Sequence, residues 1–165
     1  MIIKGRVIAV LPENVDTDVI FPGRYLNVTD KEKTKDYLFD LSYPELKNEI
    51  KEGDIIVAGR NFGCGSSREQ ATTALKYAGI KAVIAPSFAR IFYRNSLNQA
   101  LAPIISKEAP SSINKGDEVE INLETGTIKN LTSGKEMPAA KLDSKAIELL
   151  EAGGLIPRLK AKYAH

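Results

Sequence analysis

The sequence predicts an α/β fold: a small parallel βαβαβ core with an added β-hairpin region, in a single domain spanning residues 1–165. Between residues 54 and 105, short apolar segments of strand length alternate with helical patterns, an order typical of a parallel sheet with crossover helices. The last third instead alternates polar and apolar residues and turns at Thr125-Gly126, as hairpins do. A chain of 165 residues is long enough to bury the core of one such domain.

The N-terminal third begins with a strand and continues as a loop. Residues 2–11 are apolar and β-branched, which predicts a strand. Residues 12–29 contain two prolines, a glycine and the triplet Asp16-Thr17-Asp18, which favour a long structured loop. We expect both aspartates to form turn and backbone hydrogen bonds. Residues 31–51 predict one or two short helices that end at Gly53.

The middle of the chain carries the regular core. Residues 54–59, 81–86 and 100–105 are predicted as short buried strands. A helical stripe follows the first strand and ends at Gly79; its members are Ala71, Ala74, Leu75 and Ala78. Residues 87–100 predict a second helix with Ser87 as its N-cap. Helices are also expected at 144–152 and after Gly153-Gly154.

Composition excludes several kinds of chemistry. Cys64 is the only cysteine, and His165, the only histidine, is the last residue, which we expect to be frayed. A zinc site of His and Cys, an Fe–S cluster held by this chain alone and a Ser-His-Asp mechanism are therefore excluded. A net charge of +2 without a basic stripe argues against nucleic acid. No apolar stretch approaches membrane-spanning length, so we expect a soluble, cytoplasmic protein without a membrane partner.

The segment GRNFGCGSSRE, residues 59–69, lies between a predicted strand and a predicted helix. One interpretation is a capping box, in which Ser66 caps the helix and Glu69 bonds back. A second is an anion site at the helix N-terminus. A nucleotide fits this second interpretation poorly, because Arg68 stands where the dinucleotide fingerprint has Gly or Ala, and the Lys-Ser/Thr pair of a P-loop is missing.

A third interpretation uses the polar side chains together. Arg68 offers a rigid fork suited to a carboxylate. Ser66 and Ser67 stand at the same positive helix end, which favours a serine alkoxide. Such a base beside a bound carboxylate could remove the proton from the neighbouring carbon, the difficult step in eliminating water from a hydroxy acid. The departing hydroxyl also needs a Lewis acid, for which this chain has no ligands, so a partner must supply it.

The sequence resembles the small, swivelling domain of the aconitase superfamily, and most closely the small subunits of 3-isopropylmalate dehydratase and homoaconitase. Five segments in family order carry this resemblance over nearly the whole chain. They are Asn14–Asp18, Phe21–Leu26, Gly59–Glu69, Ser87–Asn95 and Glu151–Leu155. The resemblance implies a swivelling β/β/α fold and a hydro-lyase that isomerises a small hydroxy acid by dehydration and rehydration.

The resemblance also implies how the work is divided. A separate large subunit would carry a [4Fe–4S] cluster on three cysteines, and this chain would bind no metal or cofactor. Ser66 would be the general base, while Ser67 and Arg68 would hold a substrate carboxylate. Cys64 is expected to be an inert loop residue. For Arg90 and Arg94 we expect internal salt bridges, with contacts to substrate or to the large subunit as the alternative.

The sequence of the loop Tyr25-Leu26-Asn27-Val28 helps to predict which hydroxy acid is the substrate. The resemblance implies that the residues just after the Tyr-Leu pair, Asn27 and Val28, face the variable substituent of the substrate, where homoaconitases tend to have arginine and isopropylmalate enzymes apolar residues. No cation is present in this loop, so a third carboxylate would be left unpaired. Val28 suits a branched alkyl group, whereas Asn27 departs from the apolar pattern. Isopropylmalate, in leucine biosynthesis, is therefore the expected substrate; homocitrate, dimethylmalate and citramalate remain alternatives, as does a non-catalytic carboxylate-binding module.

Overall fold

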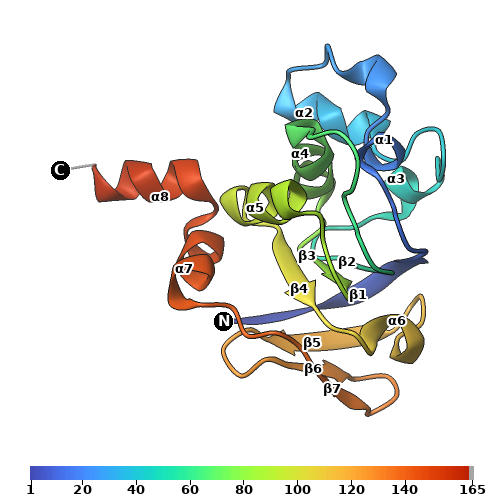
Figure 1. Cartoon of the computed structure of the whole chain (residues 1–165), viewed down its shortest axis with the longest axis vertical. Coiled ribbons are helices and arrows are strands. Elements are labelled where there is room, and N and C mark those ends of the chain that lie inside the picture. The colour runs from blue at the N-terminus through green and yellow to red at the C-terminus, as the bar shows by residue number, and fades with distance from the viewer. Residues whose placement is uncertain (164–165) are drawn as a thin grey trace.

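The computed structural model describes residues 1–163, and the expectation for His165 lies outside them. Within these residues, strands form one sheet in the order β4-β3-β2-β1-β5-β6-β7. β1 pairs in parallel with β2 and antiparallel with β5, so it joins the two halves of the sheet (Figure 1). The strands are β1 (Ile2–Leu11), β2 (Ile55–Ala58), β3 (Ala82–Ala85), β4 (Ala102–Ile105), β5 (Glu118–Asn122), β6 (Thr127–Asn130) and β7 (Glu136–Pro138).

Helices cover both sides of the parallel half. Figure 1 shows α1 to α4 on one side of it and α6 with the antiparallel strands on the other. α8 lies at the margin of the molecule, after α7. The helices are α1 (Thr17–Ile20), α2 (Lys31–Thr34), α3 (Leu46–Glu49), α4 (Glu69–Ala78), α5 (Arg90–Asn98), α6 (Ala109–Ser112), α7 (Ser144–Ala152) and α8 (Leu155–Lys162), with 3-10 turns η1 (Gly23–Tyr25) and η2 (Lys35–Tyr37).

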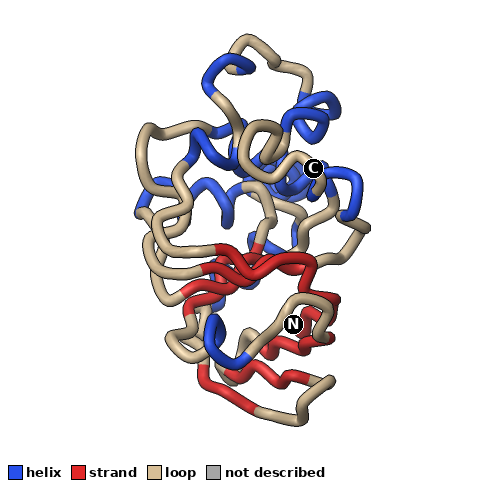
Figure 2. The backbone as a smooth tube through the Cα atoms, turned by 90° about the vertical axis from the view of Figure 1, so that its right-hand side faces the viewer, coloured by secondary structure: helices blue, strands red, loops and turns tan. Residues whose placement is uncertain are grey.

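The parallel strands are buried on both faces, which explains their continuous apolar sequences. In β2, Ile56 packs into the core beneath the helices, whereas Ile55 and Val57 pack into a second core toward the antiparallel strands. The antiparallel strands form a separate layer beneath the parallel ones (Figure 2). The curled sheet, together with α6 and α7, therefore encloses the second core, while the helices on the other side close the first.

Most predicted elements are confirmed, including the parallel β2-α4-β3-α5-β4 order and the β5–β6 hairpin. The structure adds β7, a third antiparallel strand that pairs with β6. The predicted serine cap of the second helix is wrong. α5 begins at Arg90 after Ala89, and Ser87 Oγ instead accepts a hydrogen bond from the Asn61 amide, 2.9 Å away.

None of the helices within residues 1–163 is long and apolar enough to cross a membrane.

Candidate active site

The glycine loop, residues 59–68, lies at the carboxyl end of β2, between extensions of the two neighbouring strands. On one side, the Gly63 amide donates to the Val15 carbonyl at 2.7 Å. On the other, the Ala89 amide donates to the Phe62 carbonyl at 3.0 Å. Ligands bind at the carboxyl ends of parallel strands, so the backbone places this loop where a site is expected.

Gly63 allows the loop to pack closely on the start of α5. Its φ is +81°, and a Cβ built at this position would lie 2.2 Å from Cγ of Phe92. Only glycine fits both the left-handed backbone and the close approach. The Phe92 ring meets the Phe62 ring edge-on, with centroids 5.2 Å apart. Glycine and aromatic packing together fix the first turn of α5 against the loop.

The capping-box interpretation of Ser66 and Glu69 is wrong. α4 begins at Glu69, its N-cap is Arg68 in an extended conformation, and no side chain caps it. The reason lies in a contact with Thr17, whose hydroxyl donates to the Ser66 carbonyl at 2.6 Å. This contact holds the chain outside the helix, so Ser66 and Ser67 precede the helix end instead of forming it. Both serines are exposed.

Arg68 is fixed by an acidic residue that the sequence did not pair with it. Its Nη1 donates to Asp18 Oδ1 at 2.8 Å and to the Phe21 carbonyl at 3.1 Å, and its side chain is only 16% exposed. Asp18 Oδ1 also accepts the Gly23 amide at 2.8 Å. The hydrogen bond from Arg68, followed by that from Gly23, lowers the pKa of the Asp18 carboxyl.

The backbone hydrogen bonds expected for both aspartates are confirmed. Asp16 Oδ1 accepts the Val19 backbone amide at 2.8 Å, and Asp18 Oδ1 accepts the Gly23 backbone amide. The Arg68–Asp18 ion pair joins residues fifty positions apart. No local spacing could have indicated it, because it depends on how the two loops meet beyond β1 and β2.

A cavity of about 270 Å³ opens between the glycine loop and the start of α5. Ser67, Arg68 and Arg90 contribute to its wall, together with Phe92 and Asn95, and no Asp or Glu lines it. Ser66 lies between Gly65 and Ser67, which both line the cavity. The structure thus brings Ser67 and Arg68 to the wall of one positively charged cavity, which suits an anionic ligand, while Ser66 is their neighbour in sequence and does not itself line it.

The two remaining predicted site residues lie elsewhere. Neither Asn27 nor Val28 lines this cavity. Val28 is half-buried against the first core, and Asn27 is exposed. The loop is nevertheless tied to the start of α4, because Gln70 Nε2 donates to the Leu26 carbonyl at 3.2 Å.

The prediction that Arg90 and Arg94 form internal salt bridges is wrong. Neither arginine forms an ion pair with any residue in the described part of the chain, and both are exposed. Arg90 instead lines the cavity, and Arg94, one helical turn further, does not. Cys64 is half-buried, and its carbonyl accepts the Thr17 amide at 2.9 Å.

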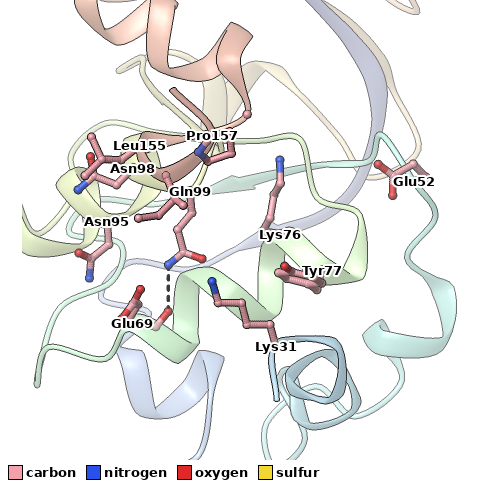
Figure 3. Close-up of a pocket in the computed structure, with 12 residues that line it drawn as sticks. Lys31, Glu52, Glu69, Lys76, Tyr77, Asn95, Asn98, Gln99, Leu155 and Pro157 are labelled. Carbon is pink, nitrogen blue, oxygen red and sulfur yellow. Dashed lines mark hydrogen bonds between the residues drawn. The ribbon is translucent and has the colours of Figure 1, made fainter. Parts of the chain in front are cut away.

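A larger cavity, of about 620 Å³, lies among α4, α5 and the start of α8 (Figure 3). Its charges are mixed, because Lys31 and Lys76 share the wall with Glu52 and Glu69. Burial lowers the pKa of Lys76. The larger cavity therefore lacks the one-sided charge of the smaller one.

The chain does not hold the ligands of an iron–sulfur cluster. Cys64 is its single cysteine, and residues 1–163 contain no group of three or more His, Cys, Asp or Glu side chains placed to bind a metal ion. Such clusters need several thiolates. The residues present do not fit this cofactor.

Comparison with known proteins agrees with this geometry. A family model described as the aconitase C-terminal domain matches residues 14–109, which include the glycine loop and α5. The chain belongs to the aconitase C-terminal domain family. This membership confirms the resemblance inferred from the five ordered segments.

Several named relatives match nearly the whole chain. An isopropylmalate/citramalate isomerase small subunit from Methanocaldococcus jannaschii is 53% identical over 99% of this chain and 96% of its own length. A 3-isopropylmalate dehydratase small subunit from Aquifex aeolicus is 51% identical, with coverage of 98% and 96%. A methanogen homoaconitase small subunit from Methanothermobacter thermautotrophicus is 49% identical, with coverage of 94% and 89%.

A solved structure confirms the fold. The crystal structure of 3-isopropylmalate dehydratase from M. jannaschii matches with a TM-score of 0.91 and 47% identity, covering 99% of this chain and 96% of that one. The mixed α/β fold with its curled sheet is therefore shared with a dehydratase of this family.

Proposed function

We propose that this chain is the small subunit of a two-subunit hydro-lyase that converts 2-isopropylmalate to 3-isopropylmalate by dehydration and rehydration. The observation that carries the proposal is the cavity that unites Ser67 and Arg68 beside Ser66, with cationic side chains and no carboxylate on its wall. Relatives that share 53% and 51% sequence identity with this chain carry names that support the same activity. The large subunit, implied by those names, would supply the cluster and the Lewis acid that the reaction needs.

Within this chain, each residue of the loop would have its own task. Arg68, oriented by Asp18, would bind a substrate carboxylate together with the Ser67 hydroxyl. Ser66 would remove the proton from the adjacent carbon. The positive charge of the cavity would stabilise its alkoxide and the charge that develops on the carboxylate. Because the Thr17 hydroxyl holds the Ser66 carbonyl, the backbone of this base is fixed before substrate binds.

Asn27 and Val28 would set the choice among hydroxy acids. No cation stands in this segment, so the proposal favours an uncharged substituent over the additional carboxylate of homocitrate. Citramalate is a second candidate, because the relative from M. jannaschii at 53% identity is named for both acids.

The test is the hydro-lyase activity of the chain reconstituted anaerobically with its large subunit. Isopropylmalate, citramalate, dimethylmalate and homocitrate are compared for the wild type and Ser66→Ala. We expect the highest kcat/KM on isopropylmalate, and a kcat lower by about 10³-fold in Ser66→Ala, because general base catalysis contributes about that much. Ser111→Ala is the matched control: Ser111 is an exposed serine of α6 whose hydroxyl donates only to the Glu108 carbonyl.

Robust activity in Ser66→Ala would move the base to the large subunit. Tight dicarboxylate binding by the isolated chain, without activity in the reconstituted pair, would instead support a carboxylate-binding module.

A further inference from the structure

Arg68 alone does not give the smaller cavity enough positive charge to bind a carboxylate well. Asp18 Oδ1 accepts from Arg68 Nη1 at 2.8 Å, so a carboxylate already compensates that guanidinium. An anion bound to Arg68 would then form a group of one positive and two negative charges, in which the anion is repelled by Asp18 as well as attracted by Arg68. A cavity that binds a carboxylate well needs a further positive charge.

Arg90, the first residue of α5, can supply that charge. It lines the same 270 Å³ space as Ser67 and Arg68, and no Asp or Glu is among the lining residues. It forms no ion pair within the described residues. With Arg68 and Asp18 cancelling, Arg90 leaves the site with one net positive charge, which a bound carboxylate would neutralise.

The backbone holds Arg90 firmly in this position. The residue before it, Ala89, donates its amide to the Phe62 carbonyl at 3.0 Å, and the Phe62 amide donates to the Ser87 carbonyl at 3.2 Å. Two residues after Arg90, Phe92 is buried against Gly63 with no room for a Cβ between them. Arg90 thus starts α5 at a fixed place relative to the glycine loop, while its exposed side chain remains able to reach a ligand.

We propose that Arg90 completes the carboxylate subsite of this chain, so that the carboxylate held by Ser67 and Arg68 lies between two guanidinium groups. The inference rests on the proposed function and deepens it by adding a substrate-binding residue. Arg90 acts on binding, because its charge attracts the carboxylate in substrate and transition state alike.

The experiment compares Arg90→Gln with Arg94→Gln, a matched control one turn along α5 whose exposed side chain lines no part of the cavity. Each variant is assayed with isopropylmalate in the pair reconstituted with saturating large subunit. We expect KM to rise about 10- to 100-fold in Arg90→Gln, the usual loss for a charge-assisted contact, with kcat nearly unchanged. Arg90→Lys, which keeps the charge, should recover part of the loss, and Arg94→Gln should match the wild type.

A second measurement does not depend on turnover. The isolated chain, labelled with ¹⁵N, is titrated with isopropylmalate, and the amide signals of Ser67 and Arg68 are followed by NMR. Arg90→Gln should shift the titration to at least tenfold higher concentration, and Arg94→Gln should not.

The results distinguish a substrate-binding role of Arg90 from a role in subunit contact. An unchanged titration and KM in Arg90→Gln would overturn the subsite. So would a variant whose only defect is weaker affinity for the large subunit, because Arg90 would then be a subunit contact. A wild-type pair that is inactive on every acid, combined with a titration weakened by Arg90→Gln, would refute the proposed reaction and retain the subsite.

Discussion

The two cavities beside α4 and α5 differ in size and in charge, and the smaller one has the features of a catalytic site. The larger, of about 620 Å³, is lined by lysines and glutamates in equal number. The smaller, of about 270 Å³, is lined by two arginines and no carboxylate, and a glycine loop fixed on both sides forms its wall. Volume alone would select the larger cavity, whereas charge and a rigid backbone favour the smaller one as the site.

The largest effect that would test this comparison is expected at Gly63. Gly63→Ala forces a left-handed backbone on a residue with a side chain and drives its Cβ into Phe92. We expect the free energy of unfolding to fall by about 3 kcal/mol, from backbone strain and overpacking together, and activity to be lost. Denaturant unfolding of the isolated chain measures the first effect.

Gly116→Ala is the control for Gly63→Ala. Gly116 is also left-handed, with φ +94°, but nothing lies within 4 Å of a Cβ built there. It should lose only about 1–2 kcal/mol from backbone strain. Equal losses in the two variants would show that the loop does not pack on α5 as tightly as described.

A smaller effect is expected at Asp18, which orients Arg68 without lining the cavity. Asp18→Ala removes an acceptor from both Arg68 and the Gly23 amide, and we expect kcat/KM in the reconstituted pair to fall about tenfold or more through loss of positioning. Because the Asp18 side chain is 61% exposed, unfolding free energy should change by less than about 1 kcal/mol. Asp18→Asn keeps an oxygen acceptor and should lie closer to wild type; an equally severe loss there would show that an oxygen acceptor alone does not orient Arg68.

The smallest effect is expected in the larger cavity. Lys76→Met removes a half-buried ammonium whose pKa burial already lowers. We expect kcat/KM to stay within about twofold of wild type, as for substitutions remote from a functional feature. A tenfold loss at saturating large subunit would contradict the distinction between the cavities and make the larger one part of the site.

Local patterns in the sequence determined the kinds of element and the position of the glycine loop. Alternating apolar segments predicted the parallel core and the hairpin, because burial repeats with the period of a strand or a helix. The single cysteine already argued against an iron–sulfur cluster held by this chain alone. The residue types in Ser66, Ser67 and Arg68 already indicated carboxylate chemistry.

Only the tertiary structure decided what these residues contact. Ser66 stays outside α4 because Thr17 holds its carbonyl, and Asp18 pairs with Arg68 across fifty positions. Arg90 lines the cavity and forms no ion pair within the described residues. Local rules for caps and ion pairs consider near neighbours in sequence, and they failed at each of these positions. The contacts that replaced the expected ones arise where the carboxyl ends of β1, β2 and β3 meet, and their proximity is set by strand order, which no short segment encodes.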